Sequence, residues 1–186
     1  MEKTKDMKKV TFMIGPSGSG KSRTASRYQE ETGLDFIIDV DAFKLQLNDF
    51  KPLCKKRNAE LHPEASKMAK DKLDSIRVGS GWVLYDSTGK DFKKVQQRTL
   101  DFLESGFEVE FLLVELGLIN TLLNVHVRNG TSSRAMLLRV SAVIWFQCKY
   151  TQRKIKKGYL AGCKVKRVQG FRRISVTFFN SLESNK

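Results

Sequence analysis

The sequence predicts a three-layer α/β fold in which helices cover both faces of a mainly parallel sheet. Short β-prone apolar runs alternate with amphipathic stretches of helical spacing through residues 10–114. Such alternation is typical of βαβ units, which place neighbouring strands in parallel. Hydrophobic residues make up 40% of the 186 residues, enough for the core of one domain. This composition excludes wholesale disorder.

The first part of the chain contains two expected strands, each followed by a helix. Residues 10–14 form a β-prone run that ends at a glycine-rich turn, so they predict a buried first strand. Residues 22–32 have a helical pattern, and Gly33 stands where a C-cap glycine is expected. Residues 36–40 predict a second strand, after which Asp41 can cap a short helix.

The middle of the chain continues the alternation up to residue 114. A helix is expected over 63–77, because Pro63 suits a first helical turn and the following apolar residues share one face. The next expected elements are a strand at 82–85, a helix at 92–103 ended by Gly106, and a strand at 107–114. After residue 115 the pattern weakens, and residues 174–179 could supply a last strand.

A phosphate-binding loop follows the first strand. The sequence GPSGSGKS at 15–22 matches GxxxxGK[ST] in full, and four specified positions arise by chance in fewer than about 1% of chains this long. Its backbone N–H groups can surround an anion, and the next helix N-terminus adds its dipole. In this motif Lys21 reaches the β- and γ-phosphates, and the Ser22 hydroxyl ligates Mg²⁺. ATP and Mg²⁺ are therefore the expected cofactors, and the nucleotide-binding residues are Gly15, Pro16, Ser17, Gly18, Ser19, Gly20, Lys21 and Ser22.

The phosphate-binding loop alone does not distinguish a kinase from a motor or a GTPase. The guanine-specificity motif NKxD is absent, and the short single-domain layout favours a kinase of small molecules or nucleic acids. The segment IIDVDAFK at 37–44 ends the second strand at the sheet edge where ligands bind. A carboxylate there can accept the proton of an attacking hydroxyl, and a nearby cation can hold substrate phosphate.

Three segments together resemble the zeta-toxin and phage polynucleotide-kinase branch of P-loop kinases: GPSGSGKS, IIDVDAFK, and LYDSTGK at 84–90. The resemblance covers roughly residues 8–135 and implies the three-layer P-loop NTPase fold. It implies that Asp41 is the catalytic base and that Lys44 contacts the substrate. It also implies that Asp86, Thr88 and Lys90 line the acceptor pocket. From the residues alone, Asp41 also fits a helix N-cap, and both lysines also fit a solvated surface.

The resemblance further implies an arginine-bearing lid near residues 128–137. The segment VRNGTSSR at 127–134 is similar to that lid, so Arg128 and Arg134 are the candidates to stabilise the charge of the transferring phosphate. The family usually continues with a proline and an acidic amphipathic helix, and this chain has neither at that place.

The positive charge is concentrated towards the C-terminus. Residues 1–119 hold 20 basic and 19 acidic side chains, whereas residues 120–186 hold 14 basic and one acidic side chain. The net charge of +14 favours polyanionic partners such as nucleic acid. We expect a kinase domain over 1–148 and a basic segment over 149–186. Three interpretations of this segment remain open: a nucleic-acid-binding tail, a solvated extension, or an atypical C-terminus such as one read in a shifted frame.

The expected setting is the cytoplasm, or the host cytoplasm if the chain comes from a phage. Three cysteines without metal-ligand spacing fit a reducing compartment. Neither a signal peptide nor a membrane span is apparent, and no obligate protein partner is inferred. The predicted activity is transfer of the γ-phosphoryl group of ATP to a hydroxyl, on a DNA or RNA 5′ end or a hydroxymethylated base of phage DNA. The alternatives are a zeta-toxin-like kinase of a nucleotide sugar and a nucleic-acid-binding ATPase without an organic acceptor.

Overall fold

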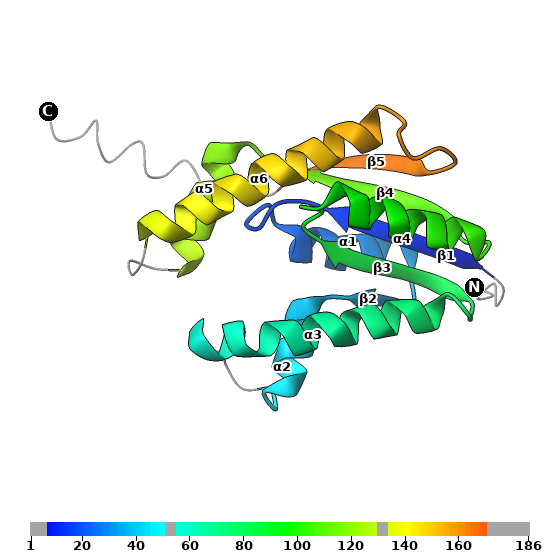
Figure 1. Ribbon diagram of the computed structural model, residues 1–186, viewed down its shortest axis with the longest axis horizontal. Helices are drawn as coiled ribbons and strands as arrows, with labels where there is room; N and C mark the ends of the chain where they lie inside the picture. Colours follow the sequence, from blue (N-terminus) through cyan, green and yellow to red (C-terminus); the bar gives the residue numbers. More distant parts are fainter. Residues whose placement is uncertain (1–6, 51–54, 130–133, 171–186) are drawn as a thin grey trace, which may run out of the picture.

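The computed structural model describes residues 7–50, 55–129 and 134–170, and it confirms the predicted three-layer α/β fold (Figure 1). The strands are β1 (Lys8–Ile14), β2 (Phe36–Ile38), β3 (Gly81–Ser87), β4 (Glu108–Glu115) and β5 (Lys164–Gln169). The helices are α1 (Lys21–Thr32), α2 (Val40–Leu47), α3 (Lys55–Ile76), α4 (Phe92–Glu104), α5 (Leu118–Asn129) and α6 (Arg134–Lys156).

All five strands form one parallel sheet in the order β2-β3-β1-β4-β5. The register places Ile14 opposite both Ser87 and Leu113, so β1, β3 and β4 reach the same edge of the sheet. Ligands bind outside the carboxyl ends of the strands in open sheets of this kind. The topology therefore fixes where the functional site can form.

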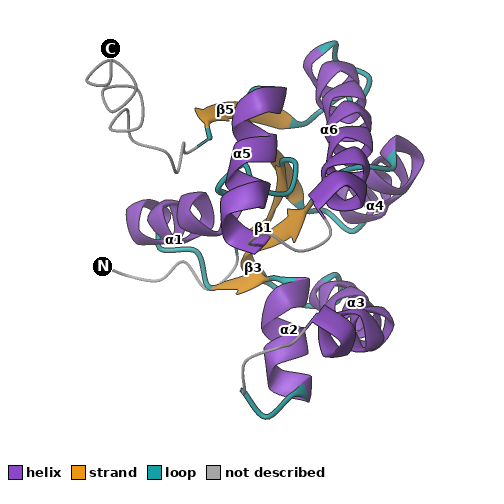
Figure 2. Ribbon diagram, turned by 90° about the vertical axis from the view of Figure 1, so that its left-hand side faces the viewer, coloured by secondary structure: helices purple, strands orange, loops and turns teal. Residues whose placement is uncertain are grey.

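Each face of the sheet has its own apolar core, because alternate residues of a strand point to opposite faces. Val10, Phe12 and Ile14 pack with buried residues of α3, α4 and α6, whereas Met13 packs with Ala25 and Tyr28 of α1. Figure 2 shows the same division, with α1 on one side of the strands and α3, α4 and α6 on the other. One strand thus joins the two cores immediately before the phosphate-binding loop.

The two helices after β2 differ from prediction at their starts. Asp39, not Asp41, is the N-cap of α2, and its carboxylate accepts a hydrogen bond from the Asp41 N–H at 2.9 Å. Helix α3 begins at Lys55, so Pro63 lies in its interior. The apolar face of α3 extends from Leu61 to Ile76, and its burial outweighs the backbone hydrogen bond that proline cannot make.

The C-terminal third contains α5, α6 and β5, none of which the sequence pattern predicted. The domain boundary predicted between residues 148 and 149 falls within α6, and β5 belongs to the predicted basic segment. The last strand predicted at 174–179 lies outside the described residues.

Ion pairs attach the edge strand β5 to the sheet. The buried Glu110 carboxylate lies 2.7 Å from Lys9 Nζ and 3.1 Å from Lys166 Nζ, and the Tyr28 hydroxyl donates to it at 3.1 Å. Burial opposes ionisation of Glu110, but its bonds with Lys9 and Lys166 outweigh that effect and lower its pKa. Part of the positive charge of the basic segment is therefore paired with a carboxylate of the sheet.

Candidate functional site

One cavity of about 1150 Å³ lies at the carboxyl edge of the sheet. Its walls come from the phosphate-binding loop, the start of α2, the end of β3 and the first turns of α4, with smaller contributions from α3, α5 and α6. The polar side chains that line it are Ser17, Lys21, Ser22, Arg23, Asp39, Asp41, His62, Ser66, Tyr85, Asp86, Ser87, Thr88, Lys90, Asp91, Lys94, Arg98 and Asn124.

The phosphate-binding loop has the conformation that anion binding requires. Gly18 and Gly20 have φ values of 83° and 86°, which disfavour residues with a side chain. Ser19 N–H donates to the Pro16 carbonyl at 3.1 Å, and α1 begins at Lys21 without an acidic residue in its first turn. The loop and the start of α1 therefore have the arrangement that the motif predicts for phosphate binding.

Helix α5 and the end of β5 support this loop from behind. The buried Asn124 amide donates to the Gly18 carbonyl at 2.8 Å. A Cβ atom at Gly170 would lie 2.5 Å from the Ser19 carbonyl oxygen, so the chain leaving β5 passes directly against the loop. Sequence reasoning missed both contacts, although an asparagine within the apolar run of α5 was a usable signal.

An ion pair joins the phosphate-binding loop to the end of β3. Lys21 Nζ lies 3.7 Å from Asp86 Oδ1, and their side chains are only 13% and 10% exposed. Burial raises the pKa of Asp86 to about 6, with Asp39 and Asp41 adding to the rise and Lys21 opposing it. Asp86 Oδ1 has no hydrogen-bond partner among the described residues. The contact with Lys21 is therefore a long ion pair rather than a hydrogen bond, and both side chains line the cavity.

The start of α2 brings two carboxylates to the same cavity. Asp39 and Asp41 both line it, and the Asp41 side chain is 58% exposed. Lys44 lies one helical turn after Asp41, and its Nζ is 2.8 Å from Asp41 Oδ1. Lys44 itself is buried and does not line the cavity. Lys44 therefore contacts Asp41, and the substrate contact that the family resemblance implies for Lys44 stays a prediction.

The opposite wall carries three basic side chains and the carboxylate of Asp91. Thr88 and Lys90 line the cavity, and Lys94 and Arg98 follow at intervals of four residues along α4. The Arg98 guanidinium donates to the Tyr85 hydroxyl at 2.9 Å and lies 5.0 Å from the centre of that ring. Sequence reasoning missed Lys94 and Arg98, although their spacing on one helix face could have identified them.

Helix α3 adds His62 and Ser66 to the cavity wall. Burial and the charge of Lys44, together with Lys90, lower the pKa of His62 although Asp41 opposes the shift. These surroundings therefore favour the uncharged form of the imidazole. No sequence signal placed this histidine in the site, because Pro63 suggested an entry turn.

The predicted lid arginines lie on two different helices. Arg128 is in the last turn of α5, and Arg134 is the first residue of α6. Their side chains and residues 130–133 lie outside what the structure describes. The lid therefore stays a prediction.

Membrane spans and clusters of metal-ligating side chains are both absent from residues 7–50, 55–129 and 134–170. No helix in these ranges is long and apolar enough to cross a membrane. No group of three or more His, Cys, Asp or Glu side chains in the same ranges could by itself hold a metal ion.

Comparison with known proteins identifies relatives of this fold. The family model described as Zeta toxin matches residues 2–183, and no curated protein matches the chain. One similar solved structure comes from work on the PezAT chromosomal toxin-antitoxin system of Streptococcus pneumoniae. It is 17% identical with a TM-score of 0.69, over 98% of this chain and 85% of that one.

Two other solved structures share the fold over part of their length. The AvrRxo1-ORF1:-ORF2 structure with ATP is 17% identical with a TM-score of 0.62, over 88% of this chain and 55% of that one. The Pnkp1/Rnl/Hen1 RNA repair complex contains a chain that is 19% identical with a TM-score of 0.57, over 82% of this chain and 48% of that one. This chain thus spans about half of those two relatives, and at these identities the likeness shows the fold alone.

Proposed function

Because the chain belongs to the zeta toxin family, as its sequence resemblance predicted, we propose that it transfers the γ-phosphoryl group of ATP to a hydroxyl group, preferably on nucleic acid. The observation that carries this proposal is the shared cavity. The phosphate-binding loop, Asp41 and the end of β3 line one space of about 1150 Å³. A triphosphate and an acceptor hydroxyl can meet there with a carboxylate beside them.

The nucleotide half of the reaction rests on the phosphate-binding loop. Its N–H groups and Lys21 would hold the β- and γ-phosphates, in line with the AvrRxo1-ORF1:-ORF2 structure with ATP. The residues also fit Mg²⁺: the Ser22 hydroxyl opens α1, and the Asp86 carboxylate has a buried oxygen without a hydrogen-bond partner among the described residues. When bound, the ion neutralises part of the phosphate charge. On this proposal Asp86 would contact the ion beside the nucleotide, whereas the family resemblance implies that it lines the acceptor pocket.

The acceptor half rests on Asp41. Its exposed carboxylate accepts the proton of the attacking hydroxyl while the hydroxyl oxygen forms a bond to the γ-phosphorus. The bond between the γ-phosphorus and the bridging oxygen breaks, and ADP leaves with that oxygen. Lys44 and the Asp39 N-cap hold the Asp41 segment in place. Arg128 and Arg134 would cover the developing phosphate charge.

The choice of nucleic acid as acceptor rests on charge. Lys90, Lys94 and Arg98 form the wall next to the acceptor position, and they suit an acceptor that carries phosphate. The likeness in fold to a chain of an RNA repair complex agrees with this choice. A nucleotide sugar also carries phosphate, so it is the second candidate acceptor.

An acceptor screen with radiolabelled ATP tests the proposal. We expect label on single-stranded DNA or RNA with a 5′-hydroxyl, and label only on a nucleotide sugar would select the second candidate. ATP hydrolysis without label on any acceptor would contradict the kinase proposal and indicate an ATPase.

A further inference from the structure

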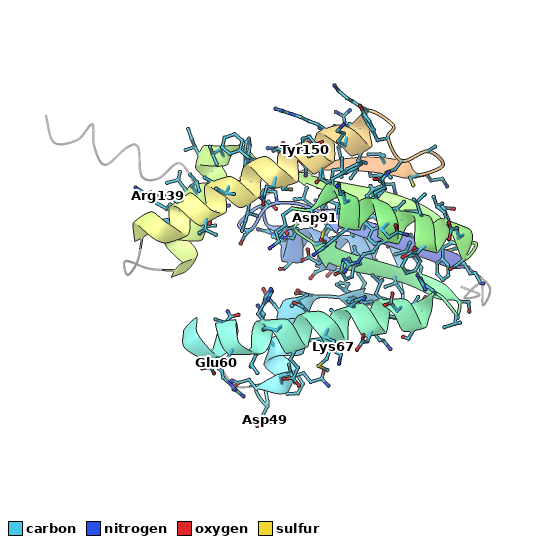
Figure 3. All side chains as sticks on the ribbon, viewed as in Figure 1. Asp49, Glu60, Lys67, Asp91, Arg139 and Tyr150 are labelled. Atoms are coloured by element: carbon cyan, nitrogen blue, oxygen red, sulfur yellow. The ribbon has the colours of Figure 1, made fainter. Side chains whose placement is uncertain are left out.

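A second cavity of about 530 Å³ opens between α4 and α6, beside the main cavity. It is lined by Lys90, Asp91, Phe92, Lys93, Gln147 and Tyr150. Lys90 and Asp91 also line the main cavity, so the two spaces are adjacent. Figure 3 shows Asp91 and Tyr150 at these two neighbouring helices. An extended acceptor that leaves the main cavity past Lys90 would enter this second space.

The walls of the second cavity carry aromatic rings that suit base stacking. Tyr150 is 54% exposed, and its ring meets Phe92 edge to face with 6.4 Å between the ring centres. Lys154 Nζ lies 5.6 Å from the Tyr150 ring centre and 3.9 Å from that of Tyr159, which is also 54% exposed. Two exposed rings therefore flank one ammonium group along the surface of α6 and the turn after it.

The charge of this surface suits a polyanion. Helix α6 contains no Asp or Glu, and Lys93 is exposed at the start of α4. Among the described residues, Asp91 is the one carboxylate that lines the second cavity, and it already accepts a hydrogen bond from the Lys94 N–H as the N-cap of α4. Exposed rings alternating with cations are the features with which proteins bind single-stranded nucleic acid.

We propose that Lys90, Lys93, Tyr150, Lys154 and Tyr159 form a binding track for a single-stranded nucleic acid whose end occupies the main cavity. We call these residues the α4–α6 track. Bases stack on Tyr150 and Tyr159, and the lysines contact the backbone phosphates. The proposal rests on the proposed function, because it takes the acceptor to be a nucleic acid. An acidic protein could pair with the lysines, but it has no bases to stack on the rings of Tyr150 and Tyr159.

The test measures binding of the full chain to a fluorescent oligothymidylate of about 12 nucleotides, within the site sizes of single-strand binding proteins. We expect Tyr150→Ala to weaken binding about 5-fold to 150-fold, as loss of one stacked base implies. Tyr150→Phe should restore wild-type affinity, because it keeps the ring. The double variant with Lys93→Gln and Lys154→Gln should bind with a weaker salt dependence. The slope of the log association constant against log salt concentration should decrease in magnitude by about 1.4. Lys67→Gln, on the exposed side of α3 (Figure 3), is the matched control and should change nothing.

Wild-type affinity in Tyr150→Ala, equally tight binding of polyglutamate, or no binding of the oligonucleotide would overturn the track. Phosphoryl transfer to a nucleoside 3′-monophosphate, which carries a free 5′-hydroxyl, in the same preparations tests the kinase proposal separately. If the oligonucleotide binds through Tyr150 but receives no phosphate, the track stands and nucleic acid is the wrong acceptor.

Discussion

Gln152 should be among the most sensitive positions of the fold, although it lies far from the phosphate-binding motif in sequence. It is 1% exposed on α6. Its amide donates to the Ile14 carbonyl at 2.9 Å and to the Val114 carbonyl at 3.1 Å. These carbonyls belong to the ends of β1 and β4, where the strands separate and the phosphate-binding loop begins. One side chain therefore connects both strand ends and attaches α6 to them.

The cost of Gln152→Leu follows from the groups that it leaves unpaired. Two buried carbonyls lose their donor, at about 1–3 kcal/mol each. The Gln152 amide oxygen has no hydrogen-bond partner among the described residues, so its removal returns about 1–3 kcal/mol. The net expectation is a loss of about 1–3 kcal/mol of unfolding free energy. Nucleotide affinity should also fall, because Ile14 directly precedes the loop.

Urea unfolding followed by circular dichroism measures this loss. Gln147→Leu is the matched control, since Gln147 is an exposed glutamine on the same helix. The midpoint of Gln152→Leu should fall while the slope of free energy against urea stays constant. Equal midpoints for the two variants would refute the claim that this side chain supports the strand ends.

Three further predictions concern other parts of the molecule. Asp41→Asn should lower the transfer rate about 10²-fold to 10⁴-fold with ATP affinity retained, whereas the exposed Asp49→Asn should retain full activity in the same assay. Glu110 has a lowered pKa, so it stabilises the fold above the ordinary value of 4.5 and loses that effect as the pH falls through its folded value. Thermal melts from pH 7 to pH 3 should therefore show a weaker acid dependence in Glu110→Gln than in the exposed Glu104→Gln. Gly89 has φ 61°, and a Cβ there would lie 2.5 Å from Cγ2 of Ile14, the last residue of β1. Gly89→Ala should thus destabilise the protein by at least about 1–2 kcal/mol in chemical denaturation, and unchanged stability would contradict the observed turn.

The first 115 residues could be predicted well because their signals are local. Alternating apolar runs give the strands, and Gly33 caps α1 with φ 67° where the sequence expected it. The later elements lack such signals. Helix α6 exposes Val143, Phe146 and Tyr150, which breaks the usual apolar stripe, and β5 has the sequence KVKRVQ because an edge strand needs little apolar surface.

Residues of the candidate site could be predicted from the sequence where they belong to a known motif. Residues that only the tertiary fold brings to the cavity could not be predicted. Lys21, Asp41, Asp86, Thr88 and Lys90 all line one cavity, although their roles remain predictions. The cations that α4 adds depend on how that helix packs against the sheet. Lys44, which was predicted to contact the substrate, is buried on α2. Helix α2 packs against α3, which begins earlier than Pro63 suggested.

The position of the supporting residues along the chain has a consequence for synthesis. The residues proposed for chemistry at 15–22, 41 and 86 leave the ribosome first. The groups that brace the phosphate-binding loop come later, at Asn124, Gln152 and Gly170. Once roughly the first 115 residues have emerged from the ribosome, every one of those early groups is exposed before the residues that support the loop have emerged. Nucleotide binding should therefore develop late in translation, once α6 has packed against the sheet and β5 has joined it.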